Sequence, residues 1–139
     1  MPGLWPDSES SAVQFAPSLL ITDDDRDFRE TLRDVFQPRG CRTLLAADGE
    51  EALRIVQHDE IHLVLIDLHM PRLNGAEAIA QIKELRAELP CILLSGELDE
   101  AKRVGAGAFD ILGKPVTRAQ VTQIVVDALR TTYNWSGKL

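Results

Sequence analysis

The sequence predicts an α/β domain in which helices cover both faces of a five-stranded parallel sheet. Short apolar runs alternate with segments whose apolar residues recur at helical spacing, which favours a parallel sheet. One run is apolar without interruption from Leu63 to Ile66, as is typical of a strand covered on both faces. The most distinctive acidic and basic residues directly follow such runs, at the carboxyl ends of the predicted strands.

The length and composition indicate one globular domain. A chain of 139 residues with 45% hydrophobic and 27% charged residues is long enough for a single substantial core. The formal charge of -7 argues against direct binding to nucleic acid. No apolar stretch approaches the roughly 20 residues that a membrane helix needs, and the start lacks the pattern of a secretory signal. We therefore expect no membrane association and a cytoplasmic location.

Apolar spacing and turn residues define the elements of the first half. The first helix carries Phe28, Leu32 and Val35 at helical spacing, and Pro38 stops it. The pair Asp48-Gly49 is a turn signal that separates the second strand from the second helix. The first half is thus predicted to contain strands at 18–22 and 41–46 and helices at 26–37 and 50–57.

The second half repeats the alternation. Turn residues Asn74-Gly75 follow the third strand, and Ile79 and Ile82 lie on one face of the next helix, whose unit ends at Pro90. The predicted strands here are 62–66, 91–94 and 108–112, and the predicted helices are 76–87, a short one at 98–105, and 117–131.

The expected topology brings several acids together. With right-handed crossovers, the natural strand order at this size is 2-1-3-4-5, the flavodoxin-like, doubly wound order of a (βα)5 three-layer sandwich. The first and third strands are then neighbours, so Asp23, Asp24 and Asp67 converge at one edge. Packed acids do not all stay charged without a cation. The pattern therefore predicts a divalent metal site beside a reactive carboxylate.

The ends of the chain are predicted to lie outside the domain. Residues 1–17 contain three prolines and no clean period, which indicates a disordered or arm-like leader. The domain itself is predicted at 18–131, and 132–139 form a C-terminal tail or the start of a linker. Cys41 and Cys91 open strands that are not neighbours, so we expect two buried, reduced thiols and no disulfide.

Four stretches carry a family resemblance: LLITDDD (19–25), LVLIDLHMPRLNG (63–75), ILLSG (92–96) and AGAFDILGKP (106–115). In this order and spacing, over roughly 18–131, the chain resembles the receiver domains of bacterial two-component response regulators. The resemblance implies a phosphorelay signalling domain that catalyses its own phosphorylation and dephosphorylation and is not a conventional turnover enzyme.

The resemblance also implies a set of site residues. Asp67 would be the phosphoacceptor. Asp23 and Asp24, together with Asp67, would hold Mg²⁺ (or Mn²⁺), with Asp24 the more direct ligand of the acid pair, and the backbone carbonyl of His69 would supply another oxygen. Carboxylates and carbonyls are the ligands that Mg²⁺ prefers, so the chemistry is consistent with the residues.

Further residues would bind the phosphoryl group or respond to it. Ser95 would bond the group and move toward it, and Lys114 would pair with its oxygens. The Lys114-Pro115 peptide bond would be cis. Gly96 beside Ser95 leaves room for the phosphodonor, and Glu97 and the His69 side chain are tuning candidates.

The implied partners are those of such a switch. A histidine kinase or a histidine phosphotransfer protein would supply the phosphoryl group, and a downstream output protein or domain would read it. We expect a monomer or a weak homodimer. The sequence leaves open whether the domain stands alone or is part of a longer regulator.

Two features depart from the family pattern. Receivers usually carry Tyr or Phe three residues before the lysine, where this chain has Ile111. The segment from Ser95 to Lys114 is a few residues short, which gives a shortened fourth helix, weakened further by Gly105 and Gly107. We expect phosphorylation with an atypical readout.

Three other functions are alternatives to a phosphoaccepting switch. A receiver-like module that binds a partner without phosphorylation is the main alternative, favoured by Ile111. A phosphatase with an aspartyl nucleophile would need a second acid where His69 stands. A flavin site would need a Ser/Thr/Gly phosphate loop, whereas the acids from Asp23 to Asp25 repel phosphate.

Overall fold

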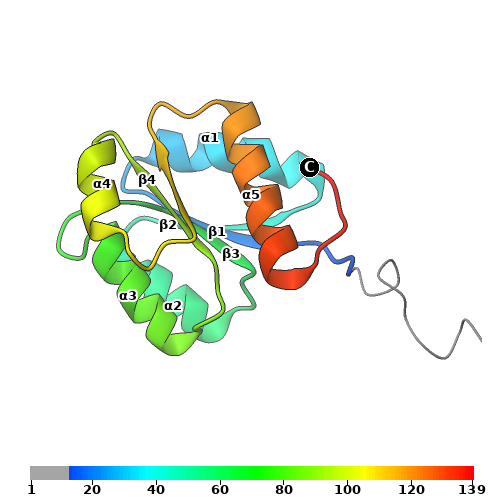
Figure 1. The fold of residues 1–139 in the computed structure, drawn as a ribbon, viewed down its shortest axis with the longest axis horizontal. Coiled ribbons are helices and arrows are strands. Elements are labelled where there is room, and N and C mark those ends of the chain that lie inside the picture. The colour runs from blue at the N-terminus through cyan, green and yellow to red at the C-terminus, as the bar shows by residue number, and fades with distance from the viewer. Residues whose placement is uncertain (1–12) are drawn as a thin grey trace, which may run out of the picture.

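The protein folds as a five-stranded parallel sheet in the order β2-β1-β3-β4-β5, which confirms the predicted fold class and strand order (Figure 1). A computed structural model describes residues 13–139. The strands are β1 (Ser18–Thr22), β2 (Arg42–Ala46), β3 (Leu63–Asp67), β4 (Cys91–Ser95) and β5 (Asp110–Gly113); the helices are α1 (Arg26–Phe36), α2 (Gly49–His58), α3 (Gly75–Leu85), α4 (Leu98–Val104) and α5 (Arg118–Tyr133), and a 3-10 helix, η2 (Gln37–Arg39), follows α1.

The helices form two layers around the sheet. Helices α1 and α5 lie on one face, and α2, α3 and α4 lie on the other (Figure 1). Successive strand residues point to opposite faces, so Leu19 and Ile21 pack with α1 and α5, whereas Leu20 packs with α2 and α3. The three central strands β1, β3 and β4 are buried along their whole length, because both faces are covered.

The strand register places the candidate site. Thr22 of β1 pairs with Ile66 of β3, and Asp67 pairs with Leu94 of β4. The carboxyl ends of the central strands are therefore level, and the residues that close or follow them share one edge of the sheet.

Side-chain caps fix where the helices begin. The Asp25 carboxylate accepts hydrogen bonds from the backbone N–H groups of Asp27 and Phe28 at the start of α1, so Asp25 caps this helix. Asn74 and Thr117 begin α3 and α5 with reciprocal capping boxes. Within residues 13–139, no helix combines the length and the apolar character needed to cross a membrane.

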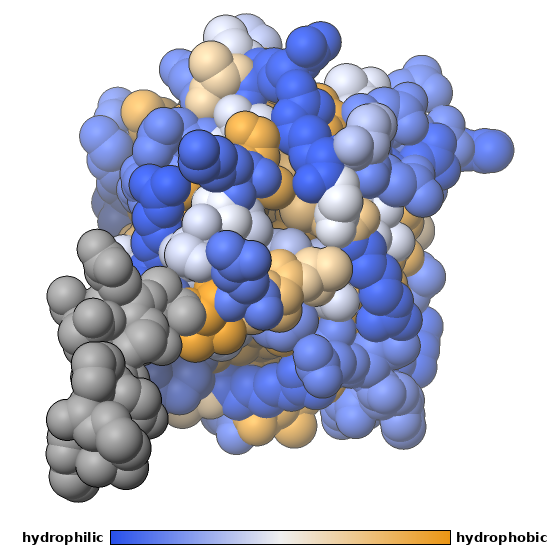
Figure 2. All heavy atoms as spheres, turned by 90° about the vertical axis from the view of Figure 1, so that its right-hand side faces the viewer, coloured by the Kyte–Doolittle hydropathy of each residue, from blue (hydrophilic) through white to orange (hydrophobic). Residues whose placement is uncertain are grey.

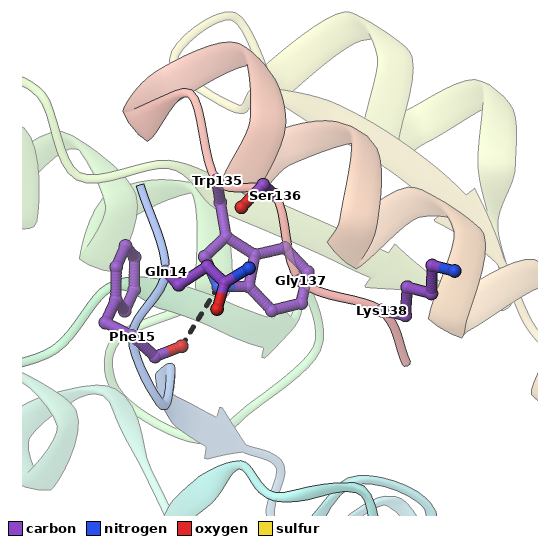
Figure 3. Close-up of a pocket in the computed structure, with 6 residues that line it drawn as sticks. All are labelled: Gln14, Phe15, Trp135, Ser136, Gly137 and Lys138. Carbon is purple, nitrogen blue, oxygen red and sulfur yellow. Dashed lines mark hydrogen bonds between the residues drawn. The ribbon is translucent and has the colours of Figure 1, made fainter. Parts of the chain in front are cut away.

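The two ends of the described chain pack against each other. Helix α5 continues to Tyr133, two residues past its predicted end. Val13 and Trp135 form a parallel bridge, and the buried Trp135 donates its Nε1–H to the carbonyl of Phe15 at 3.0 Å (Figure 3). We call residues 13–15 and 133–136 the terminal clasp. Figure 2 shows that the surface on this side is mostly hydrophilic, with apolar patches scattered over it.

The terminal clasp consists of residues that lie beyond the predicted domain boundaries at 17 and 131. Parts of the expected leader and of the expected tail pack against the domain: the Phe15 ring lies against the His62 ring, and the Tyr133 ring meets the His62 ring edge-on. The domain boundaries themselves stay a prediction, and the part of the leader at 1–12 lies outside the described residues.

Both cysteines are free and buried. Burial raises the pKa of Cys41 to about 11 and that of Cys91 to about 12, so both thiols stay protonated near neutral pH. Cys41 precedes β2 and Cys91 opens β4, which are not adjacent in the sheet.

Candidate functional site

Three carboxylates meet at the carboxyl edge of the sheet. Asp23 and Asp24 follow β1 and Asp67 ends β3, and one oxygen from each lies within 4.8 Å of the others. Asp23 and Asp67 are buried, whereas Asp24 is exposed. The convergence expected from the strand order is therefore present.

Lys114 reaches this cluster from the end of β5. Its ammonium donates to Oδ2 of Asp23 at 2.7 Å and lies 3.0 Å from Oδ1 of Asp67. It also lies 4.2 Å from the centre of the Phe28 ring. One cation thus contacts two of the three acids, and the Lys114-Pro115 peptide bond that follows is cis, as the resemblance implies.

The site keeps an excess of negative charge. Burial raises the pKa of Asp67, the hydrogen bond from Lys114 opposes this, and the charges of Asp23 and Asp24 raise it further. Burial acts to lower the pKa of Lys114, but hydrogen bonds and charges from Asp23 and Asp67 outweigh it, so that pKa is raised. The lysine stays charged among three acids, a setting that favours a further cation.

Local backbone geometry holds Asp23 in place. Its Oδ1 accepts a hydrogen bond from the backbone N–H of Asp25 at 2.9 Å, and its carbonyl accepts one from Nη1 of Arg29 at 2.7 Å. The turn into α1 therefore fixes one acid of the pair, while Asp25 is turned to its own helix.

The loop after Asp67 depends on close packing at Gly75. The Gly75 N–H donates to the carbonyl of Leu68 at 2.8 Å. A Cβ at Gly75 would lie only 2.3 Å from the backbone oxygen of Asp67. The sequence identified Gly75 as a turn residue, but the close approach to Asp67 depends on the fold and has no local signal.

Ser95 is fully buried at the end of β4, and its hydroxyl is bonded within its own loop. It donates to the carbonyl of Glu97 at 3.2 Å and accepts from the N–H of Glu97 at 2.9 Å. The adjacent Gly96 has open space around it, since a Cβ there would meet no atom within 4 Å. This is the room that the sequence suggested.

Ile111 points toward the interior beside α4. A Cβ added to Gly105 would lie 3.1 Å from Cδ1 of Ile111 and 2.9 Å from Leu93. Ile111 therefore fills the space between β4 and the end of the seven-residue helix α4. This is the position at which the family pattern has Tyr or Phe.

His69 connects the loop after β3 to α4. Its Nε2 lies 3.1 Å from Oε2 of Glu100, and both side chains are exposed. Sequence reasoning identified His69 but missed Glu100 and Phe28, because only the packed fold brings α4 and α1 to this edge.

The donor set fits a hard divalent cation. Asp23, Asp24 and Asp67 offer oxygen ligands only, and the described residues bring no thiolate or imidazole into this cluster. Oxygen donors suit Mg²⁺ or Mn²⁺ rather than zinc or copper.

Comparison with known proteins consistently matches this chain to response regulators. Residues 19–126 match the family model described as response regulator receiver domain. The chain is 36% identical over 117 residues to the response regulator MprA of Mycolicibacterium vanbaalenii, a match that covers 82% of this chain and 51% of that protein. The chain spans about half the length of the curated relatives it matches.

Solved structures give the same result at the level of the fold. A response regulator receiver domain protein from Clostridium thermocellum superimposes with a TM-score of 0.77 at 28% identity, covering 83% of this chain and 95% of that one. The response regulator TrrA from Thermotoga maritima, solved in complex with Mg²⁺ and BeF, gives a TM-score of 0.77 at 25% identity, covering 81% and 99%.

Proposed function

Since the chain belongs to the response regulator receiver domain family of two-component signalling, we propose that it accepts a phosphoryl group on Asp67. The observation that carries this proposal is the contact of Lys114 with both Asp67 and Asp23 at the carboxyl edge of the sheet. A buried carboxylate beside a fixed cation and two further acids is equipped for attack on phosphorus.

We assign the metal to the same cluster. Asp23, Asp24 and Asp67 would hold Mg²⁺ (or Mn²⁺), Asp24 more directly, together with the backbone carbonyl of His69. The bound ion would neutralise charge on the phosphoryl oxygens. The Mg²⁺ and BeF in the TrrA structure support this assignment.

The transfer itself falls to Asp67 and Lys114. A carboxylate oxygen of Asp67 forms a bond to phosphorus as the bond from phosphorus to a phosphohistidine nitrogen breaks, and the released imidazole nitrogen keeps the electron pair and takes up a proton. Lys114 leaves Oδ1 of Asp67 and pairs with a phosphoryl oxygen, supplying a point charge. Hydrolysis of the resulting acyl phosphate ends the signal.

The new charge then acts on Ser95. A phosphoryl group on Asp67 adds strong acceptor oxygens, which draw the Ser95 hydroxyl away from Glu97. Freed from this bond, the loop between β4 and α4 carries the change to the surface, where the partner-binding state is set.

The partners follow from the family. We infer that a histidine kinase or phosphotransfer protein donates the phosphoryl group and that an output protein or a domain joined to this one reads it, in the cytoplasm of a bacterium. The domain is inferred to be a monomer or a weak homodimer.

The test is intact mass after incubation with Mg²⁺ and acetyl phosphate. We expect one added phosphoryl group that requires Mg²⁺ and is absent in Asp67→Asn. Asp25→Asn is the matched control, because asparagine caps a helix as well as aspartate, and it should keep the adduct. No adduct in the wild type with several donors would favour a module that works without phosphorylation, and an adduct in Asp67→Asn would mean a different acceptor.

A further inference from the structure

An aromatic ring lies against the lysine that contacts the acidic cluster. Phe28, in the first turn of α1, is half-buried, and its ring centre lies 4.2 Å from Nζ of Lys114. This is well inside the roughly 6 Å over which a ring face attracts a cation. The contact joins α1 to the segment after β5. These two segments pass close to each other in Figure 1.

The surroundings of the ammonium make this contact significant. The Lys114 ammonium lies 2.7 Å from a carboxylate oxygen of Asp23 and 3.0 Å from one of Asp67. Its side chain is only 24% exposed, so water screens the attraction to the ring less than at an open surface. The Phe28 ring therefore attracts the positive charge of the ammonium, while the two carboxylates keep their contacts with it.

The ring itself is fixed by the start of the helix. The Phe28 N–H donates to the capping carboxylate of Asp25 at 3.3 Å, and the Phe28 side chain packs against the core between the sheet and α1. The same turn holds Asp23 through the N–H of Asp25. One turn of chain therefore fixes both an acid of the cluster and the ring beside its lysine.

We propose that Phe28 is a positioning residue that holds the Lys114 ammonium beside Asp67 while the ammonium exchanges a carboxylate oxygen for a phosphoryl oxygen. This inference rests on the proposed phosphorylation of Asp67. During the exchange Lys114 has to leave a carboxylate, and a flexible, strongly hydrated lysine side chain then moves readily into solvent. The ring keeps it at the site.

A purely structural role for Phe28 makes different predictions. Leucine would retain an apolar contact with the core but has no ring, whereas tyrosine retains the ring. The comparison of Phe28→Leu with Phe28→Tyr therefore separates the cation contact from packing. Phe36→Leu is the matched control, because Phe36 is fully buried on the same helix, whereas the ammonium of Lys114 contacts Asp23, Asp67 and the Phe28 ring.

The first readout does not depend on phosphorylation. In NMR spectra, the ring current of Phe28 should shift the protons next to the Lys114 ammonium upfield in the wild type and in Phe28→Tyr. The shift should disappear in Phe28→Leu and persist in Phe36→Leu. An unshifted Lys114 in the wild type would overturn the inference while leaving the phosphorylation of Asp67 intact.

The second readout is the rate of adduct formation from acetyl phosphate, with urea unfolding as the measure of stability. We expect Phe28→Leu to slow labelling by about fivefold, Phe28→Tyr to restore it, and Phe36→Leu to lose stability at an unchanged rate. Labelling of Phe28→Leu at the wild-type rate, or failure of Phe28→Tyr to restore it in a stable protein, would refute the positioning role. No labelling of the wild type would instead refute the proposed function.

Discussion

Ser95 and Glu97 hold each other through two hydrogen bonds, one in each direction, at 3.2 and 2.9 Å. The Ser95 hydroxyl is therefore occupied within its own loop and is not bonded to Asp67. A phosphoryl group on Asp67 has to compete with both bonds to recruit it, so the two states of Ser95 are two discrete hydrogen-bonding arrangements.

This arrangement predicts where the response to phosphorylation begins. With beryllofluoride and Mg²⁺ as a phosphoryl mimic, we expect faster amide exchange from 96 to 104, because the Glu97 N–H loses its acceptor. Ser95→Ala should show fast exchange at Glu97 without the mimic and little further change with it. Unchanged exchange across 95–111 in the wild type would exclude this segment as the output.

The contact of Lys114 with two acids predicts competition with the metal. Removal of the positive charge in Lys114→Met should tighten Mg²⁺ binding roughly tenfold in calorimetric titration, because the cluster then keeps all its negative charge for the ion. Labelling by acetyl phosphate should be much slower in the same variant. Lys102→Met, at an exposed position on α4, removes the same charge elsewhere and should bind Mg²⁺ as the wild type does; equal tightening in both variants would mean a long-range charge effect.

Close packing at Gly75 predicts a strict size limit. A methyl group there would lie 2.3 Å from the Asp67 backbone oxygen, so Gly75→Ala should lower the free energy of unfolding by about 2 kcal/mol and slow labelling by displacing Asp67. Urea unfolding and labelling kinetics measure the two effects.

Gly96→Ala is the natural counterpart. Its added methyl group meets no atom within 4 Å, so the free energy of unfolding should stay within about 0.5 kcal/mol of the wild type. Labelling should slow because the methyl group occupies space for the phosphodonor. A large loss of stability in Gly96→Ala, or none in Gly75→Ala, would contradict the packing argument.

Periodicity and turn chemistry were sufficient for the fold. The uninterrupted apolar run from Leu63 predicted a central strand. A central position for this strand makes it a neighbour of the first strand, which brings Asp23 and Asp67 together. The elements that the sequence placed less well are those that depend on contacts between distant segments. Helix α5 was expected to end at 131, because nothing local shows that Trp135 will be buried against Phe15.

The site divides in the same way. The positions of the acids after their strands were visible in the sequence, because strand ends in a parallel sheet share an edge. The ring contact of Phe28 and the Glu100 partner of His69 depend on how α1 and α4 pack. The spacing of Phe28 predicted only a core-facing helical residue. Phe28 does pack against the core, and it also contacts Lys114.

His62 predicts a pH dependence of stability at the end of the sheet opposite the acidic cluster. Its Nδ1 accepts a hydrogen bond from the Ser18 N–H at 2.9 Å, and its Nε2 lies 3.1 Å from Glu60. Burial lowers the pKa of His62 from 6.5, and Glu60 opposes this only in part, while Arg86 lowers it further. The unfolded chain therefore binds the proton more readily than the folded one.

The sign follows from this difference. The contribution of neutral His62 to stability is complete above pH 6.5 and is lost as the pH falls toward the lower folded pKa. In urea unfolding between pH 7.5 and 5.5, His62→Asn should lose less stability than the wild type, because its amide oxygen can accept the same bond without titrating. An unchanged slope in His62→Asn would assign the effect to other groups.

The two buried cysteines have a practical consequence for labelling chemistry. Because the folded domain keeps Cys41 and Cys91 covered and protonated, a thiol reagent reaches them only when the domain opens. Their rate of modification therefore reports the opening equilibrium directly. A cysteine placed on the surface, as in Lys102→Cys, would react first and alone, so that a single dye on α4 can be attached without removing either natural thiol.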